Sequence, residues 1–120
     1  MNILFLNVNR KNLIKELRSM SQECDVDIIV LAENPVSDTS ILNILNDNIK
    51  RKYQLPLNPS SRLNIYARFN REAVSPLSDS NGIAIRHIRP PLGPDFILVA
   101  VHLPSKLHLD PTDHSYLSVR

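Results

Sequence analysis

The sequence predicts an α/β fold that begins with a strand–helix–strand unit and continues into antiparallel strands. Residues 2–8 alternate as a strand does, and residues 26–32 form an apolar run of strand length. Between them lies a segment whose apolar residues recur at the spacing of a helix. Three further strand candidates follow at 63–69, 82–88 and 96–103, joined by connections too short for helices. Short connections between strands imply antiparallel neighbours.

The first unit is predicted from two kinds of periodicity. Residues 2–8 alternate and are rich in branched and aromatic side chains, which favour strands. Asn12 stands where a helix N-cap is expected. The apolar positions that follow share one helical face: Leu13, Ile14, Leu17 and Met20. The run 26–32 is almost continuously apolar, as in a strand buried on both faces, so two parallel strands are expected.

A second helix is predicted after Pro35. Its candidate N-caps are Ser37, Asp38, Thr39 and Ser40. Its apolar stripe consists of Ile41, Leu42, Ile44, Leu45 and Ile49. The basic residues 50–52 are expected at its end, where cations suit the helix dipole, and favour a solvated helix end over contact with a polyanion. Residues 89–94 form a turn between the last two strands.

The C-terminal residues are predicted to begin another helix. Residues 111–113 carry a helix start, and the sequence reaches Arg120 about one turn later without a capping residue. We therefore expect residues 1–120 to be the N-terminal part of a single, longer domain.

Composition narrows the classes of function. The chain has 120 residues, 42% of them hydrophobic, enough for one modest domain. Its charge of +2 permits a polyanionic partner without requiring one. A lone cysteine, Cys24, favours a reducing compartment. Without a signal peptide or a membrane-length apolar run, a cytoplasmic protein is expected. Only two glycines, Gly82 and Gly93, occur, which excludes glycine-rich phosphate loops.

Polar residues that end apolar strands are the candidate site residues. Asn7 ends the first predicted strand and Glu33 follows the second. The carboxyl ends of parallel strands meet at one edge of a sheet, so Asn7 and Glu33 are expected to converge. His102 ends the apolar row of the last strand in the same way.

Each candidate has an ordinary and a functional interpretation. Glu33 is either a solvated carboxylate at a strand end or a ligand for a hard cation such as Mg²⁺. Asn7 is either a turn former or an amide that positions phosphate or a metal-bound group. His102 is either a structural histidine of the core or its rim, with its hydrogen bonds made within the protein, or a hydrogen-bond donor to a phosphate or a leaving oxygen. The other histidines and the cysteine lack zinc-site spacing.

Taken in order, four segments resemble the endonuclease/exonuclease/phosphatase superfamily. They are 6–9 (LNVN), 27–33 (DIIVLAE), 81–85 (NGIAI) and 96–105 (FILVAVHLPS). The resemblance implies a four-layer α/β sandwich of two packed mixed sheets. It also implies Mg²⁺- or Mn²⁺-dependent hydrolysis of phosphoesters, foremost nuclease-like phosphodiester cleavage, with nucleic acid among the substrates.

In that family scheme Glu33 holds the metal, Asn7 helps to position phosphate or metal-bound groups, and His102 contacts the scissile phosphate or leaving oxygen. The sequence departs from the family at Ala32, where glutamine is common, and at Asn9, where some members carry aspartate. No Asp-x-Asn motif follows the 96–105 segment, and the one Asp-His pair, Asp113-His114, falls in the expected helix start and is not taken as the family's terminal pair. In the family these two motifs position and activate the water.

Two expectations follow from these departures. Residues 1–120 supply only part of an active site and are inactive alone, or the chain is an inactive copy that acts as a binding or interaction module. A half-sandwich would also expose the inner face of its sheet, which favours self-association.

Overall fold

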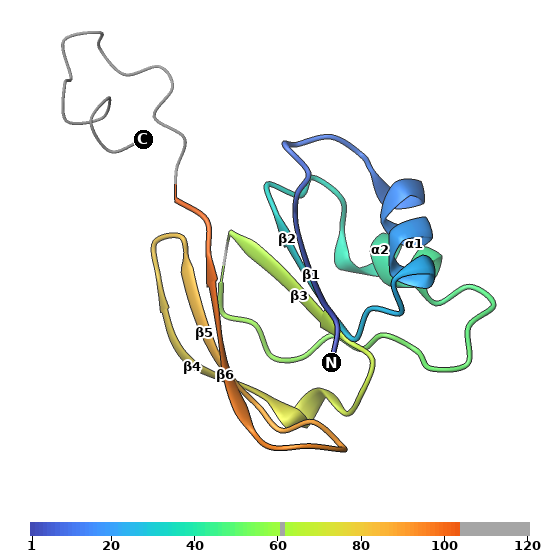
Figure 1. The fold of residues 1–120 in the computed structure, drawn as a ribbon. Coiled ribbons are helices and arrows are strands. Elements are labelled where there is room, and N and C mark those ends of the chain that lie inside the picture. Colours follow the sequence, from blue (N-terminus) through green and yellow to red (C-terminus); the bar gives the residue numbers. More distant parts are fainter. Residues whose placement is uncertain (61, 104–120) are drawn as a thin grey trace, which may run out of the picture.

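A computed structural model describes residues 1–60 and 62–103 of the chain. It has a mixed α/β fold with two α-helices and two three-stranded sheets (Figure 1). The helix start expected at 111–113 and the last residues of the 96–105 motif lie outside the described residues.

The first sheet contains β1 (Ile3–Asn7), β2 (Ile28–Ala32) and β3 (Leu63–Ala67) in the order β1-β2-β3. Strand β1 runs parallel to β2, which confirms the predicted parallel pair, and β3 runs antiparallel to β2. All five residues of β2 are buried, because this strand is central and covered on both faces. Its continuous apolar run follows from that position.

Helices α1 (Ile14–Glu23) and α2 (Asp38–Leu45) lie on the same side of the first sheet (Figure 1). Leu17 and Ile41 pack with Leu31 of β2 in one apolar core. The N-cap of α1 is Leu13, whose side chain makes no capping hydrogen bond, so the prediction of Asn12 as the cap is off by one residue. Asn12 Oδ1 still accepts a hydrogen bond of 3.2 Å from the amide of Ile14, the first residue of the helix. Within the described residues, no helix has the length and apolar character needed to cross a membrane.

Helix α2 ends earlier than its apolar stripe predicts. Residues 46–48 are Asn, Asp and Asn, which compete with helical hydrogen bonding. The Asn46 side chain also bonds the backbone of Tyr53, donating to its carbonyl (2.9 Å) and accepting from its amide (2.7 Å). Ile49 and the basic residues 50–52 therefore lie in a loop, and the prediction that they end the helix is wrong.

The second sheet is an antiparallel meander of β4 (Val74–Ser80), β5 (Ile83–Ile88) and β6 (Phe96–Val101). Strands β5 and β6 match the predicted antiparallel pair. Strand β4 was not predicted. It is an edge strand with a register irregularity between Pro76 and Ser78, and proline is tolerated at such positions. The short helix η1 (Arg71–Ala73) leads into it.

The two sheets pack face to face through a shared core. Val30 and Ile65 of the first sheet belong to the same buried cluster as Ala84, Ile88 and Ala100 of the second. The described residues thus form a helical layer, the β1–β3 sheet and the β4–β6 sheet, in that order (Figure 1).

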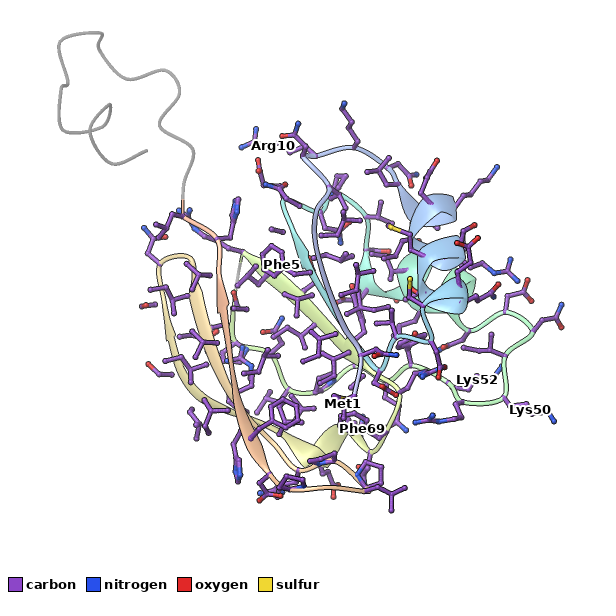
Figure 2. The ribbon with its side chains drawn as sticks, viewed as in Figure 1. Met1, Phe5, Arg10, Lys50, Lys52 and Phe69 are labelled. Carbon is purple, nitrogen blue, oxygen red and sulfur yellow. The ribbon has the colours of Figure 1, made fainter. Side chains whose placement is uncertain are left out.

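The exposed apolar surface differs from the one expected. The second sheet covers most of the inner face of the first, so exposure on that face is found at the edge strand β1, where Ile3 and Phe5 remain exposed. Phe5 is labelled in Figure 2. A second exposed row lies on the outer side of β6, where Ile97 and Val99 are each 53% exposed.

A fully buried arginine connects the second sheet to the loop before β3. The Arg86 side chain is 0% exposed and donates through Nη2 to Asp79 (3.0 Å) and to Asn58 (2.7 Å). Its Nε atom is buried without a hydrogen bond from the described residues. Asp79 supplies the countercharge that makes burial of this cation tolerable.

Candidate active site

The backbone at the carboxyl ends of β1 and β2 is unusual. Glu33, directly after β2, has a φ of 52°, and Asn9 and Arg10, just after β1, have φ values of 56° and 61°. Positive φ is uncommon for residues other than glycine. The two segments are joined by backbone hydrogen bonds from Val8 to Ala32 (3.0 Å) and from Arg10 to Glu33 (2.8 Å).

Such conformations persist only where the surrounding structure imposes them. Each costs on the order of 1–3 kcal/mol, and outliers of this kind cluster at active sites and ligand clamps. Here the outliers Arg10 and Glu33 are hydrogen-bonded to each other. Asp25 and Asn48 also have positive φ (49° and 59°), so this edge is marked by the hydrogen-bonded pair of outliers together with the side chains around Glu33.

The carboxylate of Glu33 lies between two cationic or potentially cationic groups. Its Oε2 is 3.5 Å from His102 Nε2, and its Oε1 is 3.7 Å from Arg10 Nε. The Glu33 and His102 side chains are 25% and 16% exposed, whereas Arg10 is 84% exposed. Both contacts are longer than ordinary hydrogen bonds. The carboxylate is thus partly buried and loosely held.

His102 is placed by the turn between β4 and β5. Its amide donates a 2.6 Å hydrogen bond to the carbonyl of Gly82. Gly82 has a φ of 82°, and a Cβ there would lie 2.2 Å from the carbonyl oxygen of His102. Only glycine allows these two backbones to approach so closely. Gly82 therefore sets the position of His102 relative to Glu33.

Asn7 lies at the same edge, and its side chain shapes the turn. Its backbone is in register with Ala32, one residue before Glu33. Its Oδ1 accepts a 2.8 Å hydrogen bond from the Asn9 amide, which is the turn-forming arrangement expected of asparagine. The side-chain nitrogen of Asn7, Nδ2, has no hydrogen-bond partner within residues 1–60 and 62–103.

A polar network supports the residue that follows Glu33. The Asn34 side chain donates to Asn64 Oδ1 (3.3 Å), and the Tyr66 hydroxyl donates to Asp38 Oδ1 (2.6 Å). Asn64 also donates to Asp38 (3.4 Å), which joins the two pairs. Burial raises the pKa of Tyr66, and Asp38 raises it further. Tyr66 therefore stays a neutral donor and fixes α2 against β3.

The side chains described at this edge could offer a metal ion only a few direct ligands. The described part of the chain contains no group of three or more His, Cys, Asp or Glu side chains that could hold a metal. Protein-bound Mg²⁺ commonly keeps several waters and uses one or two carboxylates together with substrate phosphates. Glu33 fits that pattern, because neither carboxylate oxygen makes a tight contact.

Two residues of the site were not identified from the sequence. Arg10 escaped notice because its role depends on the turn that bends back toward Glu33. Gly82 was noted as part of a strand motif and as one of two glycines, but not as a residue that positions His102. A signal for it existed, since it is one of only two glycines and directly precedes β5.

In comparisons with known proteins, no protein-family model matches the chain, and no curated protein sequence matches it. The candidate site is therefore defined by the chain's own residues. Glu33, His102 and Arg10 are brought together by the structure, and Asn7 supports the turn beside them.

Proposed function

We propose that this chain carries one part of a metal-dependent phosphoesterase site of the endonuclease/exonuclease/phosphatase type, acting on phosphodiesters such as nucleic acid. The observation that carries the proposal is the placement of Glu33 within 3.7 Å of both Arg10 and His102 at a strained sheet edge. A carboxylate for a hard cation next to two donors for a phosphate supplies part of what phosphoester hydrolysis needs.

Each side chain has a distinct role in this proposal. Glu33 holds Mg²⁺ or Mn²⁺, which when bound neutralises charge that develops on the phosphoryl oxygens. The exposed Arg10 guanidinium donates hydrogen bonds to a substrate phosphate. His102 donates to the phosphate or protonates the leaving oxygen. Asn7 holds the turn that carries Arg10 and offers its free amide hydrogens to the substrate.

The arrangement of layers agrees with this proposal. In a four-layer sandwich, the described helices and sheets would be three consecutive layers. The fourth would cover the outer side of the β4–β6 sheet, where Ile97 and Val99 are exposed.

The second candidate function is that of an inactive module that binds ligands or partners without chemistry. This candidate is favoured because no Asp-x-Asn motif follows the 96–105 segment, and the one Asp-His pair, Asp113-His114, lies outside the described residues. The described residues then supply no group from these motifs that activates water. Under either candidate, residues 1–120 alone are expected to show no turnover.

Metal binding provides the decisive test. We expect Mn²⁺ to bind at one site, detected by water-proton relaxation, and Glu33→Gln to weaken binding at least about tenfold because the anionic ligand is lost. Glu23→Gln, at the exposed end of α1, is the matched control and should bind as the unmodified chain does.

Equal Mn²⁺ binding by the two variants would refute the metal role of Glu33. Hydrolysis of bis(p-nitrophenyl) phosphate in Mg²⁺ is measured in parallel. Turnover that is abolished by Glu33→Ala would show that the chain contains a complete site and would overturn the expectation of inactivity.

A further inference from the structure

A cavity lies at the opposite end of the first sheet from Glu33. Its volume is about 240 Å³, and it is bounded by the C-terminal half of α1, the loop after α2 and the residue after β3. In Figure 2, Lys50 and Lys52 of that loop lie far from Arg10. Strands β1 and β2, five residues each and about 16 Å long, separate the two places. The polar and charged side chains of the cavity are Arg18, Ser21, Gln22, Lys50, Arg51 and Arg68.

The charged side chains that line this cavity are all cationic, four in number, and no carboxylate is among the lining residues. Carboxylates outside the cavity neutralise part of this charge. Arg68 is 2.7 Å from Asp25 and 3.0 Å from Asp27. Asp27 is also 3.5 Å from Arg51, and Asp47 is 3.6 Å from Arg18. Lys50 also lines the cavity and has no ion-pair partner within the described ranges.

Two of the arginines have unsatisfied hydrogen-bond donors. The Nε atoms of Arg18 and Arg68 are buried without a partner from the described residues. Burial alone would lower the pKa of Arg68, but hydrogen bonds to Asp27 and Asp25 outweigh this effect and raise it. Arg68 is thus a permanent cation. A buried N–H group without an acceptor is destabilising. These two Nε atoms are closed to solvent, so an oxyanion in the cavity would be bound through the other cationic groups of the lining side chains.

The remaining wall of the cavity is largely apolar. Leu45, Ile49 and the ring of Tyr53 complete the lining. The Tyr53 hydroxyl donates to the Val26 carbonyl (2.6 Å) and so has its own partner. Arg68 lies over the Tyr53 ring, 5.9 Å from its centre. An anionic group carried by a small organic body matches this combination of surfaces.

We propose that this cavity binds a phosphate group carried by a small organic ester. Phosphate has several acceptor oxygens that can be shared among guanidinium and ammonium donors, and guanidinium suits them geometrically. The apolar wall formed by Leu45, Ile49 and Tyr53 receives the organic part. The site is separate from Glu33 and does not depend on the proposed phosphoesterase activity.

Residue-resolved NMR titration of the full 120-residue chain tests this inference. The probes are inorganic phosphate, phenyl phosphate and benzoate, without added metal. We expect saturable shifts of the amides of residues 18–22 and 49–53, with phenyl phosphate binding more tightly than inorganic phosphate. Lys50→Met and Arg18→Met should each weaken phenyl phosphate binding at least about fivefold. Lys15→Met, on an exposed part of α1 outside the cavity, is the matched charge control.

Each outcome bears directly on the inference. Loss of binding in Lys50→Met with retention in Lys15→Met supports it. Tighter binding of phenyl phosphate than of inorganic phosphate would identify the ligand class as a phosphate ester. Equal affinity for the two would identify free phosphate as the ligand and would overturn the proposal of an ester. Benzoate that binds as well as phenyl phosphate, or shifts confined to residues 7–10 and 33, would refute a phosphate site here. Wild-type amide spectra of the variants exclude misfolding as the cause.

Discussion

Glu33 and His102 are brought together by backbone geometry more than by contacts between their side chains. The left-handed conformation of Glu33 directs its carboxylate off the end of β2, and the close approach of Gly82 fixes the backbone of His102. Glu33 and His102 could be identified from the sequence because each is a polar residue at the end of an apolar strand, and this pattern lies within a few neighbouring residues. The roles of Arg10 and Gly82 depend on segments distant in the sequence, so local patterns did not reveal them.

The Gly82→Ala substitution tests this dependence. The new Cβ would meet the His102 carbonyl at 2.2 Å, so we expect destabilisation of about 2–4 kcal/mol, from a clash added to left-handed strain. Urea unfolding and the ring signals of His102 in NMR measure the effect. Gly93→Ala is the matched control, because Gly93 also has positive φ (96°) but nothing within 4 Å of its Cβ position. Equal losses in the two variants would contradict a positioning role for Gly82.

One carboxylate joins the three strands of the first sheet at the side where β1 and β2 begin and β3 ends. Asp27, just before β2, accepts from the Asn2 amide (2.9 Å) ahead of β1 and from Arg68 (3.0 Å) after β3. The sequence predicted five of the six observed strands and both helices, because apolar period and length specify such elements. It missed β4, whose proline is acceptable only at an edge, and the end of α2, which a contact between Asn46 and Tyr53 determines.

Asp27 is expected to make stability depend on pH. Burial alone would raise the pKa of Asp27, but the Asn2 amide and Arg68 outweigh it and lower the pKa below its ordinary value of 3.8. A lowered folded-state pKa contributes stability above the ordinary value, and that contribution is lost as pH falls through the lowered pKa. Asp27→Asn should therefore destabilise the chain at pH 6.5 and have a smaller effect at about pH 3.

Urea unfolding at the two pH values measures this difference. Asp47→Asn is the control, because Asp47 also pairs with an arginine but its side chain is 61% exposed, and exposed ion pairs contribute little. The same loss of stability for Asp27→Asn at both pH values would show that the carboxylate charge is not responsible.

At the scale of the whole molecule, the described layers leave apolar surface uncovered. The outer side of β6 presents Ile97, Val99 and Val101, all about half exposed, and β6 is also an edge strand. Exposed apolar patches and free strand edges both favour association. The sequence predicted such a patch but assigned it to the inner face. It could not locate the patch, because β4 was missed and the extent of the second sheet was therefore unknown.

Self-association is expected to occur through this face. Light scattering over a range of concentrations should show an apparent mass that rises with concentration, and Val99→Lys should reduce the rise. Leu92→Lys is the matched control, since Leu92 is 89% exposed but lies in the turn before β6. A stable monomer at high concentration for the unmodified chain would refute the expectation.

The buried Arg86 also constrains the order in which the chain can fold. If the β4–β6 sheet closed over the core before Asn58 and Asp79 were in place, a guanidinium would lose its water without compensation, at a cost of several kcal/mol. Docking of the second sheet and closure of the loop before β3 are therefore expected to occur in one cooperative step.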